Sequence, residues 1–497
     1  MRCSAVGTLF IALILATPGA FSREQPHRSL LLRIDNVTLP ELEKVGLLFN
    51  VDYALQTVIS LVRDTAYVLA TNAEREVLRE RGFRCATVLA DTSELTLVKR
   101  ALYGPTMRLP TPYHTYASLL RELDSLAARH PHHLRLTPIG RTTQEKRAIY
   151  AAVIARSVSE ESDFPAILIN GCHHGDEILG AEICLAFVRE LLERYGVDTA
   201  ITRWVNSYRI FVVPVVNVDG YEVVTSGRDP RWRKNTRDTN GNGVLYEFTE
   251  GVDLNRNYDF NWAHGGSGDP ASERYRGPYP FSESETIAIA RLSRENHFLL
   301  SVTYHSQGEV IYYPWVWGER HAPDDRLLTE MARGLAGSIR TMRGDTCYKA
   351  EYGAGLVGQT YPWFYGSEGT FDFVVETGNG AAILPPGEVA GVVKANLTGL
   401  HFMLDRGGGP GLTGHIKDAA TGKPLEAVVW IPSLETEDVH RRMSERKFGR
   451  FWRFLSPGTY TIIFSKPGYA TEVREGVEVM SGGWTTLEVT LKADRKP

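Results

Sequence analysis

The sequence predicts an α/β fold. A large central domain, built on a mixed and mostly parallel sheet flanked by helices, is expected between a small N-terminal α+β unit and a C-terminal β-sandwich. The length of 497 residues corresponds to roughly three domains of about 150 residues. Apolar stretches of strand length alternate with helical periods through the middle of the chain. Near the C-terminus the pattern changes to short strands separated by Gly and Pro turns.

The composition is typical of a folded globular chain, with 43% hydrophobic and 23% charged residues. The 55 Lys and Arg residues are balanced by 59 Asp and Glu residues, so no basic excess indicates nucleic acid as a partner. No stretch after the N-terminal segment is long and apolar enough to cross a bilayer. We therefore expect a mature chain without a transmembrane segment, and we expect it to be a monomer.

Residues 1–22 have the pattern of a secretory signal peptide. Arg2 gives a positive start, Ala5 to Ala16 form a short apolar stretch, and Thr17–Gly19 breaks it before a small residue at Ala20. The alternative is a membrane anchor, for which the apolar stretch is short. We expect cleavage here and a secreted protein, periplasmic or extracellular.

Four cysteines follow this segment, and they allow three disulfide pairings. A chain of this size does not need disulfides, so free buried thiols are an equal alternative. The four are Cys85, Cys172, Cys184 and Cys347.

Residues 23–91 are predicted to form the N-terminal α+β unit, with the element order β-α-β-α-β. Asn72 is a candidate cap for its second helix, and Gly82 ends that helix. The expected elements are Leu30–Ile34, Leu39–Leu47, Thr57–Leu69, Ala73–Arg81 and Cys85–Leu89. Residues 92–111 have no clear period and contain the basic pair Lys99–Arg100, so we interpret them as a linker.

Residues 112–406 are predicted to form the central domain. A helical period covers Thr115–His130, and a second helix is expected from about Ile178 to Arg194. Several of the expected strands lack alternation, as strands buried on both faces do. These strands are Ile149–Ile154, Ala166–Asn170, Ile210–Val216, Leu299–Tyr304 and Phe371–Val375.

Residues 407–411 read Gly-Gly-Gly-Pro-Gly, which is typical of a hinge. Residues 412–497 then alternate in the manner of a small β-sandwich. The expected strands are Val428–Ile431, Gly458–Phe464, Gly476–Val479 and Trp484–Leu491.

A candidate metal site begins where the strand Ala166–Asn170 ends. His174 and Glu177 lie three residues apart on the following turn, and such a pair can bind Zn²⁺ through an imidazole nitrogen and a carboxylate oxygen. A catalytic zinc needs a third ligand, and His305 is the best candidate because it ends another apolar strand. Taken alone, His174 is more often an ordinary hydrogen-bonded histidine, and His173 is the competing ligand.

Polar groups follow other strands of the same domain. Arg233 lies in the segment Trp232–Asn235, and Asn255 and Arg256 lie in Asp253–Tyr258. A guanidinium group binds a carboxylate through a planar fork. Glu376 closes the strand Phe371–Val375, where an acid would face the same crevice. The alternative interpretation of Asp253–Arg256 is a turn whose ion pair has only a structural role.

Taken together, these segments resemble the zinc metallocarboxypeptidase family, which includes carboxypeptidases A and B. The resemblance covers about residues 112–405, and its motifs occur in the family's order. They are the HxxE turn (His174, Glu177), WRK (Arg233), GVDLNRNY (Gly251 to Tyr258), YRGPYPFSESET (Tyr275 to Thr286), YHSQ (Tyr304 to Gln307) and VVET (Val374 to Thr377).

The resemblance implies a role for each matched residue. His174, Glu177 and His305 would bind one Zn²⁺, and Asp253 would accept a hydrogen bond from the far nitrogen of His174. Glu376 would be the general base that takes a proton from the zinc-activated water, and Arg233 would stabilise the oxyanion. Asn255 and Arg256 would hold the terminal carboxylate of a peptide or protein substrate, so the C-terminal peptide bond would be hydrolysed.

Some positions depart from the family pattern. Asp176 stands where the digestive enzymes have an Arg, so one contact on the substrate side is lost. The mobile Tyr of those enzymes falls on Ala354 by direct counting, and Tyr352 takes that substrate-binding role only with a two-residue insertion. Pro362 replaces the family's Asp before Trp363. Tyr361 stands where an acid marks basic-residue specificity, which favours an apolar or aromatic terminal residue.

Asp238, Asn240 and Asn242 resemble the start of a calcium-binding loop, D-x-N-x-N-G. The twelfth position is Thr249 rather than Glu, and no flanking helix pair is evident. A Ca²⁺ site is therefore an expectation beside the alternative of a polar, glycine-rich turn.

The flanking units also resemble known modules. Residues 23–91 are similar in size and element order to the activation segment of secreted carboxypeptidases, with Lys99–Arg100 as a natural cleavage site; the alternative is a permanent accessory domain. Residues 412–497 resemble a transthyretin-like module without catalytic function. Two other functions stay open: a zinc amide hydrolase acting on cell-wall peptides or N-acyl amino acids, and a non-catalytic binding protein.

Overall fold

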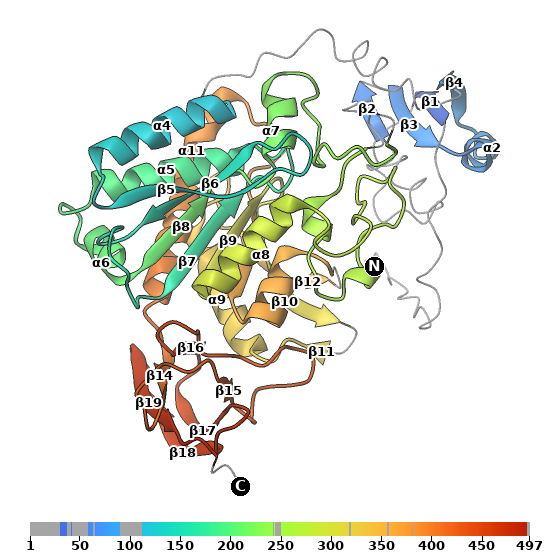
Figure 1. Ribbon diagram of the computed structural model, residues 1–497. Coiled ribbons are helices and arrows are strands. Elements are labelled where there is room, and N and C mark those ends of the chain that lie inside the picture. Colours follow the sequence, from blue (N-terminus) through green and yellow to red (C-terminus); the bar gives the residue numbers. More distant parts are fainter. Residues whose placement is uncertain are drawn as a thin grey trace, which may run out of the picture.

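The computed structural model describes residues 30–36, 41, 58–62, 65–89, 112–241, 243, 250–317, 320–354, 357–379 and 381–494 (Figure 1). The expected signal peptide (1–22), the linker (92–111) and nearly all of the expected helix Leu39–Leu47 lie outside these residues. Among the helices that are described, none combines the length and the apolar character needed to span a membrane.

The N-terminal unit is a four-stranded antiparallel sheet in the order β2-β3-β1-β4, with one described helix, α2 (Asn72–Glu80). Its strands are β1 (Leu30–Asp35), β2 (Val58–Val62), β3 (Thr65–Ala70) and β4 (Arg84–Leu89). The single strand expected over Thr57–Leu69 is wrong, because this stretch forms two antiparallel strands. The expected cap is also shifted by one residue: Thr71, not Asn72, accepts the Glu74 amide at 3.1 Å, and Glu74 accepts the Thr71 amide at 2.8 Å.

The central domain is built on a nine-stranded mixed sheet in the order β11-β10-β13-β9-β7-β8-β6-β5, with β12 paired to β10. The four middle strands, β13, β9, β7 and β8, are mutually parallel, and antiparallel strands extend the sheet on both sides. The strands are β5 (Leu134–Arg141), β6 (Ala148–Ile154), β7 (Ala166–Gly171), β8 (Arg209–Val213), β9 (Phe298–His305), β10 (Val310–Trp317), β11 (Arg320–His321), β12 (Lys349–Ala354) and β13 (Phe371–Glu376).

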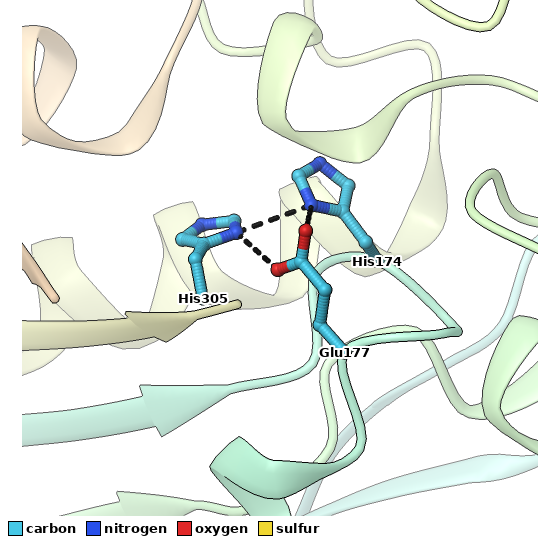
Figure 2. A group of neighbouring side chains, drawn as sticks. All are labelled: His174, Glu177 and His305. Atoms are coloured by element: carbon cyan, nitrogen blue, oxygen red, sulfur yellow. Dashed lines mark hydrogen bonds and ion pairs between the residues drawn. The ribbon is translucent and has the colours of Figure 1, made fainter. Parts of the chain in front are cut away.

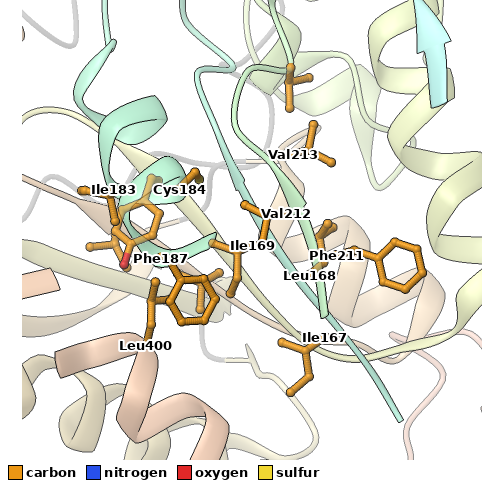
Figure 3. Close-up of a cluster of buried hydrophobic side chains, with 14 of the residues drawn as sticks. Ile167, Leu168, Ile169, Ile183, Cys184, Phe187, Phe211, Val212, Val213 and Leu400 are labelled. Atoms are coloured by element: carbon orange, nitrogen blue, oxygen red, sulfur yellow. The ribbon is translucent and has the colours of Figure 1, made fainter. Parts of the chain in front are cut away.

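The middle strands read as continuous apolar runs because helices cover them. Every residue of β7 and of β9 is buried. Side chains of α5 and α11 pack over these strands, as the cluster around Ile169, Phe187 and Leu400 shows (Figure 3). The helices are α4 (Tyr116–Arg129), α5 (Leu179–Glu193), α6 (Thr199–Ser207), α7 (Val218–Thr225), α8 (Ser284–Asn296), α9 (Asp325–Ser338), α10 (Thr360–Trp363) and α11 (Pro386–Arg406).

Strand register brings the candidate site together. In the parallel pairs, Gly171 at the end of β7 lies opposite Tyr304, and His305 at the end of β9 lies opposite Glu376 at the end of β13. Three neighbouring strands therefore end at one edge of the sheet. The polar residues that follow or close them meet there, as expected for an open α/β sheet.

The C-terminal unit has two three-stranded sheets, β16-β14-β19 and β15-β17-β18, with a separate apolar core between them. Its strands are β14 (Gly411–Asp418), β15 (Val428–Trp430), β16 (Arg450–Phe454), β17 (Gly458–Ser465), β18 (Glu472–Val479) and β19 (Trp484–Leu491). The sandwich is confirmed, but the sequence patterns missed β14 and β16. The Trp484 indole donates to the Gly407 carbonyl at 3.2 Å, so the glycine-rich segment lies against this unit.

All four cysteines that follow the N-terminal segment are free thiols, and Cys172 and Cys184 are buried. Of the two expectations for these cysteines, free thiols are therefore confirmed, and none of the three possible disulfide pairings is formed.

Candidate metal centre

A fixed turn after β7 positions the first two site residues. Cys172 adopts a left-handed backbone conformation with φ of 55°, and its carbonyl accepts the Asn217 amide at 2.9 Å. The Gly175 amide then donates to the Arg233 carbonyl at 2.8 Å. A Cβ on Gly175 would come within 2.6 Å of the Gly220 and Trp232 carbonyl oxygens, so this close approach requires glycine.

Donor atoms of His174, Glu177 and His305 converge on one point (Figure 2). His174 Nδ1 lies 2.7 Å from Glu177 Oε1, His305 Nδ1 lies 2.7 Å from Glu177 Oε2, and the two Nδ1 atoms lie 3.1 Å apart. All three side chains are buried, with at most 5% of each exposed. In the part of the chain that the structure describes, this is the one group of three His, Cys, Asp or Glu residues suited to hold a metal ion.

The donor set fits Zn²⁺. Two imidazoles and one carboxylate are a ligand set that catalytic zinc sites use, and the spacing allows one ion at about 2.0–2.2 Å from each donor. A burial-lowered pKa keeps His305 neutral, which is the form that binds a metal. Burial opposes ionisation of Glu177, but His174 and His305 outweigh it and hold the pKa of Glu177 well below its usual range. The carboxylate is therefore ionised and ready to coordinate a cation.

Neighbouring residues also contact each of the three side chains, His174, Glu177 and His305. His174 Nε2 lies 3.1 Å from Asp253 Oδ1, and His305 Nε2 lies 3.1 Å from the Asn255 side-chain nitrogen. The Ser306 amide donates to Glu177 Oε2 at 3.2 Å. The Asp253 contact orients the His174 ring with Nδ1 toward the shared point, as outer contacts of metal ligands do. Ser306 contributes through its backbone amide, a contact that was not predicted from the sequence.

Two guanidinium groups flank Asp253. Arg233 donates to Asp253 Oδ2 from Nη2 at 2.9 Å and from Nε at 3.2 Å, and its Nη1 lies 3.5 Å from Glu177 Oε1. Arg256 is 5% exposed, and its Nη1 lies 4.0 Å from the same Asp253 oxygen. Burial opposes the charge on Arg233, but Asp253 and Glu177 outweigh it and raise the pKa of Arg233.

The hydrogen-bond donors of Arg256 are only partly used by the described residues. Its Nη1 donates to the Asn255 carbonyl at 2.7 Å, while its buried Nε has no hydrogen-bond partner among the described residues. Burial lowers the pKa of Arg256 to about 10, and Asp253 opposes the shift. The group is therefore a buried cation that is only partly compensated. The Asn255 side chain is more occupied, because its oxygen accepts the Thr360 amide at 3.0 Å.

Glu376 ends β13 directly beside His305 in the register of the sheet. Burial, with the nearby negative charge of Glu177, raises the pKa of Glu376 to about 8. An acid in this environment binds and releases a proton near neutral pH, which suits proton transfer.

His173, the competing ligand, lies outside the donor group. Its Nε2 lies 2.8 Å from the Tyr258 hydroxyl, and its ring stacks on His305 at 5.7 Å between centroids. His173 is fully buried, and burial holds its pKa well below the usual value. The residue therefore packs behind the site as a neutral histidine. From the sequence, Tyr258 was known only as the last residue of the GVDLNRNY motif, with no role assigned.

The two aromatic residues expected near the substrate lie in different places. The Tyr352 hydroxyl lies 3.3 Å from Thr329 Oγ1 of α9, and its ring packs on Tyr313 and His321. None of these contacts joins Tyr352 to the metal centre. Tyr361 is buried at 2% exposure, and its hydroxyl has no partner among the described residues. Burial raises the pKa of Tyr361 and the Arg256 charge opposes the shift, so the ring lies on the Arg256 side of the site.

The expected calcium site receives no support. Both Asp238 oxygens accept backbone amides, from Gly241 at 2.6 Å and from Gly243 at 2.9 Å. Asn242 lies outside the described residues. The carboxylate thus closes a glycine-rich turn, which is the alternative interpretation of this motif.

Two family models match the chain. The model described as zinc carboxypeptidase covers residues 119–399, and the model described as carboxypeptidase regulatory-like domain covers residues 411–492. The first match contains every residue of the metal centre. The second corresponds to the sandwich, whose likeness to transthyretin is loose.

Curated relatives and solved structures agree with this assignment. The chain is 28% identical to mouse carboxypeptidase A4 over 302 residues, covering 59% of this chain and 70% of that protein. It is 28% identical to rat carboxypeptidase B over 307 residues, covering 59% and 71%. The carboxypeptidase A structure from Helicoverpa armigera has the same fold, with a TM-score of 0.56, 20% identity, and coverage of 76% and 97%. The zinc carboxypeptidase model alone covers more than half of the sequence, and the chain therefore belongs to the zinc carboxypeptidase family.

Proposed function

We propose that this protein is a secreted zinc metallocarboxypeptidase that hydrolyses the C-terminal peptide bond of peptides or proteins. One observation carries the proposal: the His174, Glu177 and His305 donors converge within 3.1 Å of one another, beside the guanidinium groups of Arg233 and Arg256. A metal centre next to groups that bind carboxylates suits a substrate with a free chain end.

In this proposal His174, Glu177 and His305 hold the zinc ion, which when bound supplies Lewis-acid activation of water and of the carbonyl group. The Glu376 carboxylate takes a proton from the attacking water and delivers it to the nitrogen of the leaving amine. The raised pKa of Glu376 makes its ionised carboxylate a stronger base than an ordinary glutamate.

The two arginines have separate tasks. Arg233 faces the metal centre from the Glu177 side and stabilises the negative charge that develops on the carbonyl oxygen. Arg256 binds the terminal carboxylate, using donors such as its unpartnered Nε. Asn255 positions His305 and offers its amide nitrogen to the same carboxylate. The buried ring of Tyr361 beside Arg256 favours an apolar or aromatic terminal residue.

The remaining segments complete the proposal. Residues 1–22 direct secretion, 23–91 form an activation segment joined by the linker 92–111, and 112–406 form the catalytic domain. Residues 407–411 connect it to the accessory sandwich, 412–497. The matches of the two family models to residues 119–399 and 411–492 support this division.

The proposal is tested with pairs of peptides that differ only in a free or amidated C-terminus. We expect release of the last residue from the free acid, loss of that release with a zinc chelator, and recovery when Zn²⁺ is added back. Mass spectrometry identifies the cleaved bond. Cleavage of internal bonds only, or equal turnover of acid and amide, would contradict an exopeptidase that recognises the terminus.

A further inference from the structure

One segment of the central domain, residues 360–370, reaches from the metal centre to the end of the sheet beside the sandwich. It begins with α10, where the Thr360 amide donates to the Asn255 side-chain oxygen at 3.0 Å. It ends at Thr370, whose hydroxyl donates to the carbonyl of the first residue of β9 at 2.8 Å. The last residue of β9 is His305, so the segment spans roughly 25 Å, the length of this eight-residue strand.

The first part of the segment lies against groups that the proposed function assigns to substrate binding. Tyr361 is 2% exposed and lies on the Arg256 side of the site. The Trp363 ring packs on the Tyr258 ring, with 5.4 Å between their centroids. A displacement of α10 would therefore move the wall that surrounds the terminal residue of a bound peptide.

The second part of the segment is a π-helical turn, η5 (Phe364–Glu368), which contacts the sandwich. The Gly366 carbonyl accepts the His440 amide at 2.8 Å and Arg442 Nη1 at 3.4 Å. The Arg442 guanidinium also lies over the Tyr365 ring, 4.9 Å from its centroid. Turns of this kind are rare and are frequent at functional sites. The sandwich thus contacts both the backbone and a side chain of the turn.

Arg442 is suited to hold this turn in place. It is 7% exposed and forms no ion pair within the described part of the chain. Burial lowers the pKa of Arg442, and the neighbouring Tyr365 and Asp324 oppose the shift. The Tyr365 hydroxyl in turn donates to Asp324 Oδ2 at 2.8 Å and accepts the Asp324 amide at 3.0 Å. Because a buried charge is costly unless its surroundings compensate it, these contacts fix the turn relative to the sandwich.

We propose that Arg442, a residue of the sandwich, is a positioning residue for binding of the substrate's terminal residue. It holds the η5 turn, and the turn sets where α10 places Tyr361 beside Arg256. The inference rests on the proposed function, because it concerns the same substrate wall. Arg442 acts only through Gly366 and Tyr365, so it has no part in proton transfer. The C-terminal unit therefore contributes to how tightly a large apolar terminal residue binds.

The test compares Arg442→Gln with the parent, both as full-length zinc-loaded protein, on peptides that differ only in a terminal Phe or Ala. KM for the Phe peptide is expected to rise about three- to tenfold, because a loosened α10 no longer packs closely around a large ring. KM for the Ala peptide should change by less than about twofold, and kcat for both peptides should stay near the parental value. A loss of folded protein would instead lower the apparent kcat for both peptides and leave both KM values unchanged.

Two further variants make the comparison specific. Arg441→Gln is the matched control, because Arg441 is exposed and lies over the Trp430 ring of the sandwich itself. It should behave like the parent on both peptides. Arg442→Lys keeps a cation beside the Tyr365 ring and should recover part of the loss. Parental KM values in Arg442→Gln, or an equal rise for the Phe and Ala peptides, would overturn the inference.

Hydrogen exchange gives a measurement that needs no turnover. The amides of residues 360–366 should exchange faster in Arg442→Gln than in the parent and in Arg441→Gln, while those of β7 stay equally protected. Unchanged exchange over residues 360–366 would overturn the positioning role in an enzyme whose parent form is active. A parent that releases no terminal residue from either peptide would overturn the proposed function itself, so the two failures are distinguishable.

Discussion

Asp253 is the acid that contacts most of the other charged groups of the site. Its fully buried carboxylate meets His174, Arg233 and Arg256, and although burial opposes ionisation, the two arginines and His174 hold the pKa of Asp253 well below its usual range. One acid thus orients a metal ligand and places two cations beside it. The spacing of these groups is fixed before any substrate arrives, which lowers the cost of organising the site.

Replacement of Glu376 by Gln tests the proton-transfer role directly. We expect kcat to fall by about 100- to 10,000-fold, because the isosteric amide cannot accept the proton. The zinc content should not change, since Glu376 is not among the converging donors. Steady-state kinetics with metal analysis measures both quantities.

Glu388→Gln, at an exposed position in α11, is the matched control and should keep full activity. A Glu376→Gln enzyme with near-parental turnover would remove Glu376 from the role of base.

Arg256→Gln separates recognition of the chain end from structural support. We expect KM for free-acid peptides to rise by about 10- to 100-fold, because a buried charge-assisted contact is lost. Turnover of the corresponding amides should change much less. The kinetic comparison of acid and amide distinguishes the two explanations. If the substitution acted by displacing Asp253 and so disturbing the metal centre, turnover of both substrates would fall alike.

At the scale of elements, the ends of three of the four parallel strands supply the functional groups. β7 leads into the His174–Glu177 turn, β9 ends at His305 and β13 ends at Glu376. Two helices of the same domain are linked through a histidine. His114, just before α4, contacts Glu182 of α5 through Nδ1 at 2.8 Å and Glu122 of α4 through Nε2 at 3.3 Å.

The His114 contacts predict a pH-dependent stability. The hydrogen bond to Glu182 raises the pKa of His114 above its unfolded value, and burial opposes the shift only in part. Stabilisation by the protonated ring is therefore complete below about pH 6.5 and is lost as the pH rises through the folded pKa. The melting temperature of His114→Gln should lie below that of the parent at acidic pH, and the gap should narrow toward alkaline pH.

His132→Gln, an exposed histidine after α4, is the control and should melt like the parent at each pH. A gap for His114→Gln that stays constant, or widens, with rising pH would contradict a protonated ring in the folded protein.

At the scale of the whole molecule, the sandwich is joined to the central domain by partly buried rings and by several ion pairs. Trp452 and Trp484 pack against the central core, and Asp163 of the central domain holds Arg450 and His415 of the sandwich. Burial disfavours the ionised form of Asp163, but Arg450 and His415 outweigh it and lower its pKa.

Asp163→Asn should loosen this junction. We expect a loss of about 1 kcal/mol of stability, because the ion pairs are partly exposed to solvent and screened. Faster protease cleavage near residues 407–411 should accompany it, with the products identified by mass spectrometry. Asp124→Asn, an exposed acid on α4, is the control. Unchanged cleavage in Asp163→Asn would show that the junction is held without the Asp163 ion pairs.

Some features could be predicted from the sequence because local physics encodes them. The buried strands β7, β9 and β13 are continuous apolar runs, and a period of 3.6 residues marks α4, so the central fold followed from burial patterns alone. The spacing of His174 and Glu177 on one turn encodes two of the three metal ligands. Their places at the ends of apolar strands also indicated His305 and Glu376, and the ordered motifs that resemble a family supplied the individual roles.

Other features required the tertiary structure, because they depend on contacts between residues far apart in the chain. Residues 57–69 divide into two strands because β2 pairs with β3 and β3 pairs with β1, and the strands β14 and β16 are stabilised by neighbours rather than by their own pattern. The position of Tyr352 against α9 and the use of Asp238 in a turn are likewise set by packing. The sequence by itself determined which groups are available for catalysis, and the fold decided their distances and burial, since both arise only when distant segments exclude water together.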